Sequence, residues 1–102
     1  MPFQAPVADY TFILENILNI GALRATERFA EATNDVTQAI LAEAGKLCDE
    51  VLAPLQRSGD LHPARLENGV VRTSPGFNAG WKAIAEGGWI GMAADPAHGG
   101  MG

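Results

Sequence analysis

The chain has 102 residues, of which 47% are hydrophobic and 19% are charged, so it has the composition of an ordinary globular protein. Its length is enough for one small domain with a modest core. The formal net charge is −5 and the seven basic residues are scattered, which argues against binding to nucleic acid or to an anionic membrane surface.

The amino-terminal third predicts an extended arm followed by short helices. Two prolines within residues 1–8 favour the arm, and Asp9 is expected to cap a helix by accepting hydrogen bonds from free backbone amides. Gly21 is the expected stop of this helix, and a second helix is expected from Ala22 to Ala30. The apolar residues at helical spacing in the first helix are Tyr10, Ile13, Leu14, Ile17 and Leu18.

A longer amphipathic helix of about five turns follows, with Thr33 as its cap. Gly45 weakens a helix interior, so its presence indicates close packing against a neighbour. Pro54 lacks an amide hydrogen and predicts either a kink or the last turn. The stripe expected to lie on a core consists of Val36, Ile40, Ala44, Leu47, Val51 and Leu55, widened by Leu41, Cys48 and Leu52.

Residues 57–74 are polar and predict irregular structure around one short hairpin. Asn68-Gly69 is a strong two-residue turn signal, because both residues tolerate positive φ. Ser74-Pro75 then predicts a helix start and Gly87-Gly88 its end. The expected buried face of that helix is Phe77, Trp81, Ile84 and Ala85.

The glycine-rich run from Asp95 to Gly102 is interpreted as the middle of a loop in a longer protein. Its spacing matches neither a phosphate-binding loop nor a dinucleotide fingerprint. Tight backbone geometry is the preferred explanation of these glycines. A loop that faces a cofactor or substrate in a complete protein remains the alternative.

Other residues offer little chemistry. Cys48 lies on the apolar stripe and is interpreted as a small hydrophobic residue rather than a nucleophile. His62 and His98 lack recognised metal-ligand spacing. Trp81 and Trp89 are interpreted as packing residues, with stacking on a flat cofactor as the alternative. We therefore assign no catalytic, cofactor-binding or metal-binding residue.

Three features bear on location. No segment approaches the roughly 20 apolar residues of a membrane span. The first basic residue is Arg24, so the basic start of a signal peptide is missing. A single cysteine excludes an internal disulfide. Together these features predict a cytoplasmic protein.

Three segments resemble the acyl-CoA dehydrogenase family. Residues 43–55 are similar to its first long helix, which ends in Glu-Val-x-Pro-Leu, and Asp60 stands where the family has an acidic residue. Residues 81–94 are similar to the passage that follows. Residues 96–102 resemble the family's Pro-Glu-x-x-Gly-Gly-x-Gly loop, although Ala97 replaces the usual Glu and His98 a common aromatic.

Further segments resemble one subgroup with an amino-terminal extension, which includes the 3-methylthiopropanoyl-CoA dehydrogenase-like enzymes. These segments are residues 4–14, residues 65–71 and Pro75-Gly76-Phe77. The resemblance implies a mostly α fold, the helical amino-terminal domain of that family with a short hairpin around Asn68-Gly69. It further implies an extension with one or two short helices over residues 1–33. Residues 34–102 would be the incomplete start of the helical domain.

The family uses FAD to oxidise the α,β carbon bond of an acyl-CoA thioester, with a glutamate base and flavin contacts located downstream of this region. The resemblance thus implies FAD, an acyl-CoA substrate, an electron-transfer acceptor and a homo-oligomer for the full-length protein. This piece would be structural, would help to wall the site and would be inactive alone. An acyl-CoA oxidase, a flavin monooxygenase and a free-standing helical interaction module are the alternatives.

Overall fold

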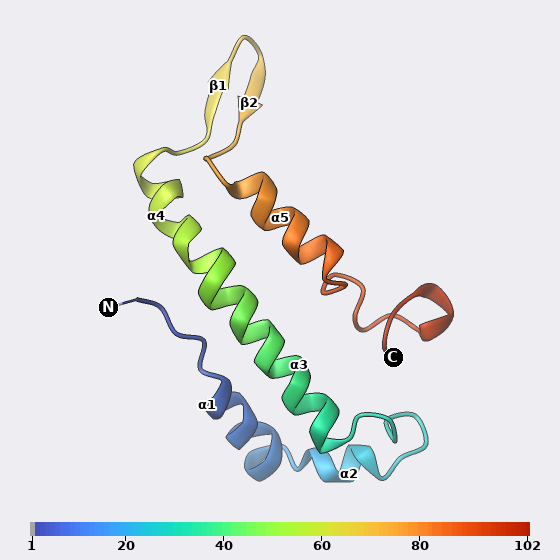
Figure 1. The fold of residues 1–102 in the computed structure, drawn as a ribbon. Helices are drawn as coiled ribbons and strands as arrows, with labels where there is room; N and C mark the ends of the chain where they lie inside the picture. The colour runs from blue at the N-terminus through green and yellow to red at the C-terminus, as the bar shows by residue number, and fades with distance from the viewer. Residues whose placement is uncertain (1) are drawn as a thin grey trace.

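A computed structural model describes residues 2–102. Its centre is one continuous helix made of α3 (Asn34–Leu47), the π-helical turn η2 (Cys48–Leu52) and α4 (Ala53–Leu61). On one side lie α1 (Val7–Phe12), the π-helical turn η1 (Ile13–Ile17) and α2 (Ile20–Arg24), and on the other side lies α5 (Phe77–Glu86) (Figure 1). Strands β1 (Arg65–Glu67) and β2 (Val70–Arg72) project from one end, and a 3-10 turn, η3 (Pro96–His98), lies near the carboxyl end. The mostly α fold class is confirmed.

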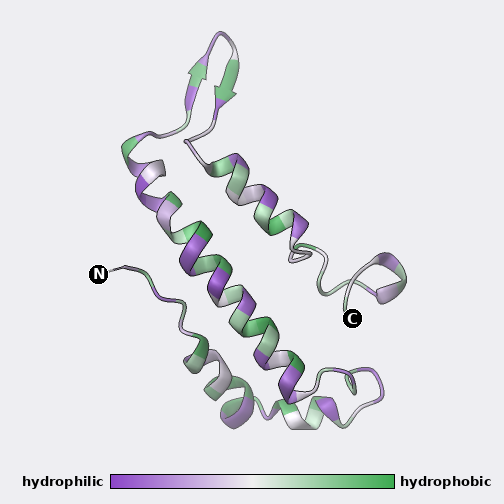
Figure 2. Ribbon diagram, in the orientation of Figure 1, coloured by the Kyte–Doolittle hydropathy of each residue, from purple (hydrophilic) through white to green (hydrophobic). Residues whose placement is uncertain are grey.

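The helices form a single thin layer rather than a packed globule. The molecule measures 55 × 37 × 17 Å, and its smallest dimension is less than two helix diameters of about 10–12 Å. The radius of gyration is 17.4 Å, against about 13 Å for a compact domain of this length. The expected core is absent: no hydrophobic side chain among residues 2–102 is buried. Apolar residues instead alternate with polar ones along helices that are open to solvent (Figure 2).

The accessible surface area of the chain is also larger than that of a compact protein. It is 7852 Å², whereas a globular chain of 10.7 kDa is expected to expose about 5,500 Å². The chain therefore exposes roughly 2,300 Å² more than a compact protein of its mass. The described residues therefore leave a large surface that they do not cover by packing on one another.

The amino-terminal helices differ from the prediction at their ends. Asp9 does not cap, because α1 begins directly after Pro6, without a side-chain cap, and places Asp9 in its first turn. The chain leaves the helix at Asn19, which adopts the left-handed conformation at φ 51°, and Gly21 lies within α2. Asparagine is one of the few residues besides glycine that tolerates this conformation. Helix α2 ends at Arg24 rather than Ala30, and turns follow it.

The long helix begins as expected and ends later. The Val36 amide donates to Thr33 Oγ1 over 3.4 Å, which confirms the cap. Pro54 does not end the helix, which continues to Leu61, so residues 57–61 are helical rather than irregular. The wide turn η2 ends at Leu52, two residues before Pro54. Widening that turn moves the carbonyl of Glu50 away from the proline ring, which would otherwise clash with it.

The hairpin is confirmed, with Asn68 at φ 50° and Gly69 at φ 77° in its turn and Leu66 opposite Val71 in its antiparallel register. Every residue of both strands is exposed. The segment before β1 turns away from α4, and the segment after β2 leads the chain back into α5, alongside the long helix (Figure 1).

Helix α5 starts at Phe77, two residues later than Ser74-Pro75 predicts. The Phe77 amide donates to the Ser74 carbonyl across a turn in which Gly76 has φ 86°. A type II turn places proline and then glycine at these central positions, so the pair forms the turn before the helix. The predicted stop is confirmed, because α5 ends at Glu86 before Gly87 and Gly88.

The predicted buried face of α5 is largely wrong. Trp81 is 61% exposed, and Phe77 and Ala85 are exposed as well, while Ile84 is half-buried. The face that packs on the long helix contains Gly80, which is buried. In a single layer, only the strip of α5 that touches its one neighbour loses contact with solvent.

Candidate functional site

The arm and α1 are fixed to the long helix by a carboxylate and by a glycine. The Ala5 amide donates to Asp49 Oδ1 over 2.7 Å, although the two residues are 44 positions apart. One turn earlier, a Cβ on Gly45 would lie 2.7 Å from Cγ2 of Val7, so only glycine allows this approach. The close packing expected at Gly45 is confirmed.

Arg24 joins three segments at the other end of the extension. Its guanidinium forms a two-pronged ion pair with Glu15, with nitrogen–oxygen distances of 3.0 and 3.3 Å. It also donates to the Ala32 carbonyl over 2.7 Å and to Thr37 Oγ1 over 2.8 Å. The Arg24 side chain is only 17% exposed, so these bonds are partly shielded from water. Charged, two-pronged hydrogen bonds of this kind are stronger than neutral ones.

The opposite side of the long helix holds α5 by apolar contact. Leu55 lies against Gly76 and Gly80, where a Cβ would come within 2.8 and 2.5 Å of its methyl groups. Ser58 adds a hydrogen bond of 2.7 Å from its hydroxyl to the Pro75 carbonyl. Two faces of one helix therefore receive two different neighbours.

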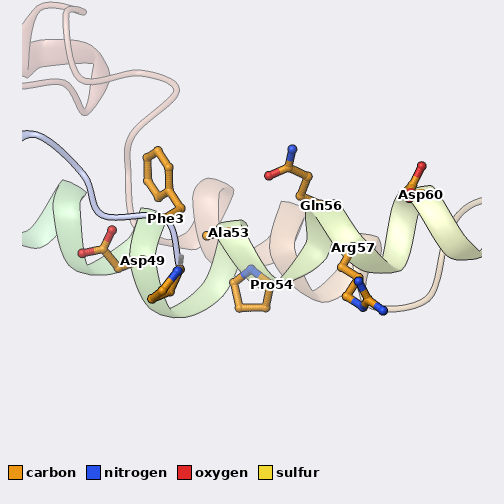
Figure 3. A pocket seen from close by; sticks show the side chains of 8 residues that line it. Phe3, Asp49, Ala53, Pro54, Gln56, Arg57 and Asp60 are labelled. Atoms are coloured by element: carbon orange, nitrogen blue, oxygen red, sulfur yellow. The ribbon is translucent and has the colours of Figure 1, made fainter.

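An open groove of about 800 Å³ lies between the arm and α4. Figure 3 shows that its polar side chains do not converge: Gln56 and Asp60 stand on one side of the helix and Arg57 projects to the other. Asp49 already accepts the Ala5 amide. Phe3 lies over the rim, so the groove resembles a gap between two packed segments rather than a binding site for a polar ligand.

The chemically versatile residues are also dispersed. Cys48 is half-buried on the long helix, while His62 directly follows α4, His98 ends η3, and both histidines are exposed. Within residues 2–102, histidine, cysteine, aspartate and glutamate form no group of three or more that could hold a metal ion. Trp81 lies on the outer face of α5, whereas the half-buried Trp89 borders a hollow of about 220 Å³ beside Glu43.

The glycine-rich end folds on itself through its backbone. Asp95 Oδ1 accepts the Ala97 amide over 2.8 Å and so caps η3, after which Gly99 adopts φ 85°. The Gly102 amide then donates to the Ala94 carbonyl over 2.9 Å, and a Cβ on Gly100 would collide with that carbonyl. These contacts support the tight-turn interpretation of the glycines.

The residues that organise this chain were not recognisable in the sequence. Arg24, Asp49 and Ser58 each bond a partner at least 8 positions away, and none has a partner at helical spacing. The arrangement can present surfaces and hold segments together, and the carboxylates of Asp49 and Asp60 that line the groove do not point toward one another. Among residues 2–102, the structure contains no helix with the length and apolarity needed to cross a membrane.

Comparison with known proteins points to one enzyme class. No family model matches the chain. Over all 102 residues it is 36% identical to the 3-methylmercaptopropionyl-CoA dehydrogenase of Ruegeria pomeroyi (strain ATCC 700808 / DSM 15171 / DSS-3), and it spans 17% of that relative's length. The resemblance to acyl-CoA dehydrogenases is thereby confirmed along the whole chain.

Proposed function

We propose that this chain is the amino-terminal helical part of a FAD-dependent acyl-CoA dehydrogenase. All 102 residues of the chain match a relative that is named as an acyl-CoA dehydrogenase. The observation that carries the proposal is the 36% identity that extends from the extension to the glycine-rich end. The complete protein would oxidise the α,β carbon bond of an acyl-CoA thioester and pass the electrons to an acceptor. FAD, homo-oligomer formation and a cytoplasmic location are parts of this proposal.

Within that enzyme the chain has a structural task. Residues 1–33 form the extension, and residues 34–102 begin the helical domain. The surplus of exposed surface, including Trp81 and Ile90, would pack against the part of the enzyme that carries flavin and substrate. The piece thus helps to wall the site and is inactive by itself.

The test compares the 102-residue chain with the complete gene product. The chain alone is expected to purify without flavin absorbance and to give no dye reduction with any acyl-CoA. The complete protein is expected to contain FAD and to reduce dye with 3-methylmercaptopropionyl-CoA or with an unbranched acyl-CoA of similar length. Stoichiometric FAD in the short chain would contradict the structural role.

Three alternatives can each be distinguished by a separate measurement. Peroxide formation at the expense of oxygen, without need for a dye, would identify an acyl-CoA oxidase, and hydroxylated product would identify a flavin monooxygenase. A reading frame that stops directly after Gly102 would favour a free-standing helical interaction module. The dehydrogenase is preferred because the relative from Ruegeria pomeroyi carries that activity in its name.

A further inference from the structure

The wide turn η2 leaves one extra residue inside the long helix. In this turn the Ala53 amide donates to the carbonyl of Cys48, five residues earlier, whereas an amide in an α-helix reaches only four residues back. The chain is α-helical on both sides of the turn. Since each residue of an α-helix advances about 100° around the axis, every side chain after η2 stands about 100° behind its place in an uninterrupted α-helix.

The extension contacts one side of the long helix. Gln38 Oε1 accepts a hydrogen bond of 3.3 Å from α1, Gly45 lies against Val7, and Asp49 accepts an amide of the arm. At about 100° per residue, these three positions on the long helix fall within about 40° of one another around its axis. All three come before Ala53, where α4 begins, so the shift caused by the extra residue does not reach them.

Helix α5 and the carboxyl-terminal segment occupy the other side (Figure 1). Val36, near the start of α3, borders a hollow with Met92, and Leu55 in α4 lies against Gly80. Val36 and Leu55 are 19 positions apart, and in an uninterrupted α-helix they would point about 100° apart. The extra residue removes this difference, so one straight side of the long helix receives α5 and the segment that follows it.

The same shift sets the angle between the two sides. Leu55 follows Gly45 by 10 positions, which corresponds to about 80° around an uninterrupted α-helix and to about 180° with the extra residue. In the first case α1 and α5 would crowd the same half of the helix. In the second case they lie on opposite sides of it, which is the arrangement in Figure 1.

We propose that η2 is a positioning element, and that its one extra residue places α5 and the glycine-rich end opposite the extension. Loss of one residue from η2 then restores an ordinary turn and leaves both sides in place. Loss of a residue elsewhere in the helix, or gain of another in η2, turns a contact away from its partner. This inference rests on contacts among residues 2–102 and does not depend on the proposed dehydrogenase chemistry.

Deletion of Glu50 in the complete gene product tests the proposal. Glu50 is exposed within η2, and its deletion is combined with Pro54→Ala, because a proline ring would clash with the carbonyl of a regular turn before it. The Ala53 amide then reaches the Cys48 carbonyl over four residues, and Leu55 keeps its place against α5. Relative to Pro54→Ala alone, hydrogen exchange of the α5 amides is expected to change by less than about twofold.

Deletion of Gln56 in the same Pro54→Ala background is the matched control, since Gln56 is also exposed but lies in the regular helix α4. The helix cannot absorb this loss, because either Leu55 or Ser58 must turn about 100° away from its contact. Exchange of the α5 amides is expected to accelerate about tenfold.

Insertion of one alanine after Glu50 completes the test in that background. It adds a second extra residue to η2, turns Leu55 a further 100° or so away from α5, and is expected to accelerate exchange as much as the loss of Gln56 does. Equal acceleration by the two deletions, or unchanged exchange of α5 after the insertion, would each overturn the proposal.

Discussion

The two sides of the long helix hold their neighbours by different forces. On the extension side, Asp49 and Arg24 make directional, charge-assisted bonds, and Gly45 allows one close approach. On the α5 side, Leu55 fills the space above two glycines and a single hydroxyl bond assists it. Directional bonds fix where a segment lies even when little surface is buried, whereas apolar contact depends on the fit of a few methyl groups. Loss of a hydrogen bond on the extension side should therefore release the extension and leave α5 in place. Loss of the apolar fit at Leu55 should release α5 and leave the extension in place.

The largest effect is expected for Gly80→Val. The new side chain collides with Leu55, and overpacking of this kind costs about 3 kcal/mol. Hydrogen exchange should accelerate in the amides of α5 but not in those of α1. The matched control is Ala79→Val, because Ala79 is exposed on the same helix and its replacement costs only the β-branched helix propensity of about 0.5 kcal/mol. Equal acceleration in both variants would refute the packing role of Gly80.

Arg24→Ala tests the extension side. The substitution removes the ion pair with Glu15 and leaves the Ala32 carbonyl without its donor, at a cost of about 2 kcal/mol. Limited proteolysis should cut sooner within residues 15–33 while α5 keeps its protection. Arg28→Ala is the control, since Arg28 lies over the Phe29 ring and makes none of these bonds. Unchanged cleavage of the Arg24 variant would show that the extension is held by other contacts.

Gly69→Ala is expected to have the smallest effect on the chain. Its φ of 77° costs a residue with a side chain about 1–2 kcal/mol, but only the hairpin depends on this turn. Amide exchange at Val70 should rise, and the melting temperature of the helices should stay the same. Gly91→Ala provides the comparison, because a Cβ there meets open space at an ordinary φ. A lower helix melting temperature for the Gly69 variant alone would mean that the hairpin supports the helical layer.

Local chemistry made part of this fold predictable. Three features follow from the conformations that their residues favour in any surroundings: the cap at Thr33, the turn at Asn68-Gly69 and the helix end before Gly87. Of the two outcomes expected at Pro54, the last turn was wrong, and the expected burial of Trp81 was wrong as well, because both depend on neighbours. A widened turn accommodates the proline, and the tryptophan lacks a covering element among residues 2–102.

The candidate site was harder to predict than the fold. The bonds that organise it join Ala5 to Asp49 and Ser58 to Pro75, at separations that follow no helical or strand period. A single sequence contains periodicity, caps and turns, but it does not state which distant segments meet. The proposed enzyme class came from the family resemblance and not from any residue pattern that the described structure brings together.

The continuous helix from Asn34 to Leu61 also sets a length. Its three segments of 14, 5 and 9 residues rise about 42 Å together at 1.5 Å per residue. The helix keeps the extension and the hairpin at a fixed separation, because Pro54 does not end it. The number of residues in the helix therefore sets the distance between its two ends, and packing does not change it. Two added turns would lengthen the helix by about 11 Å.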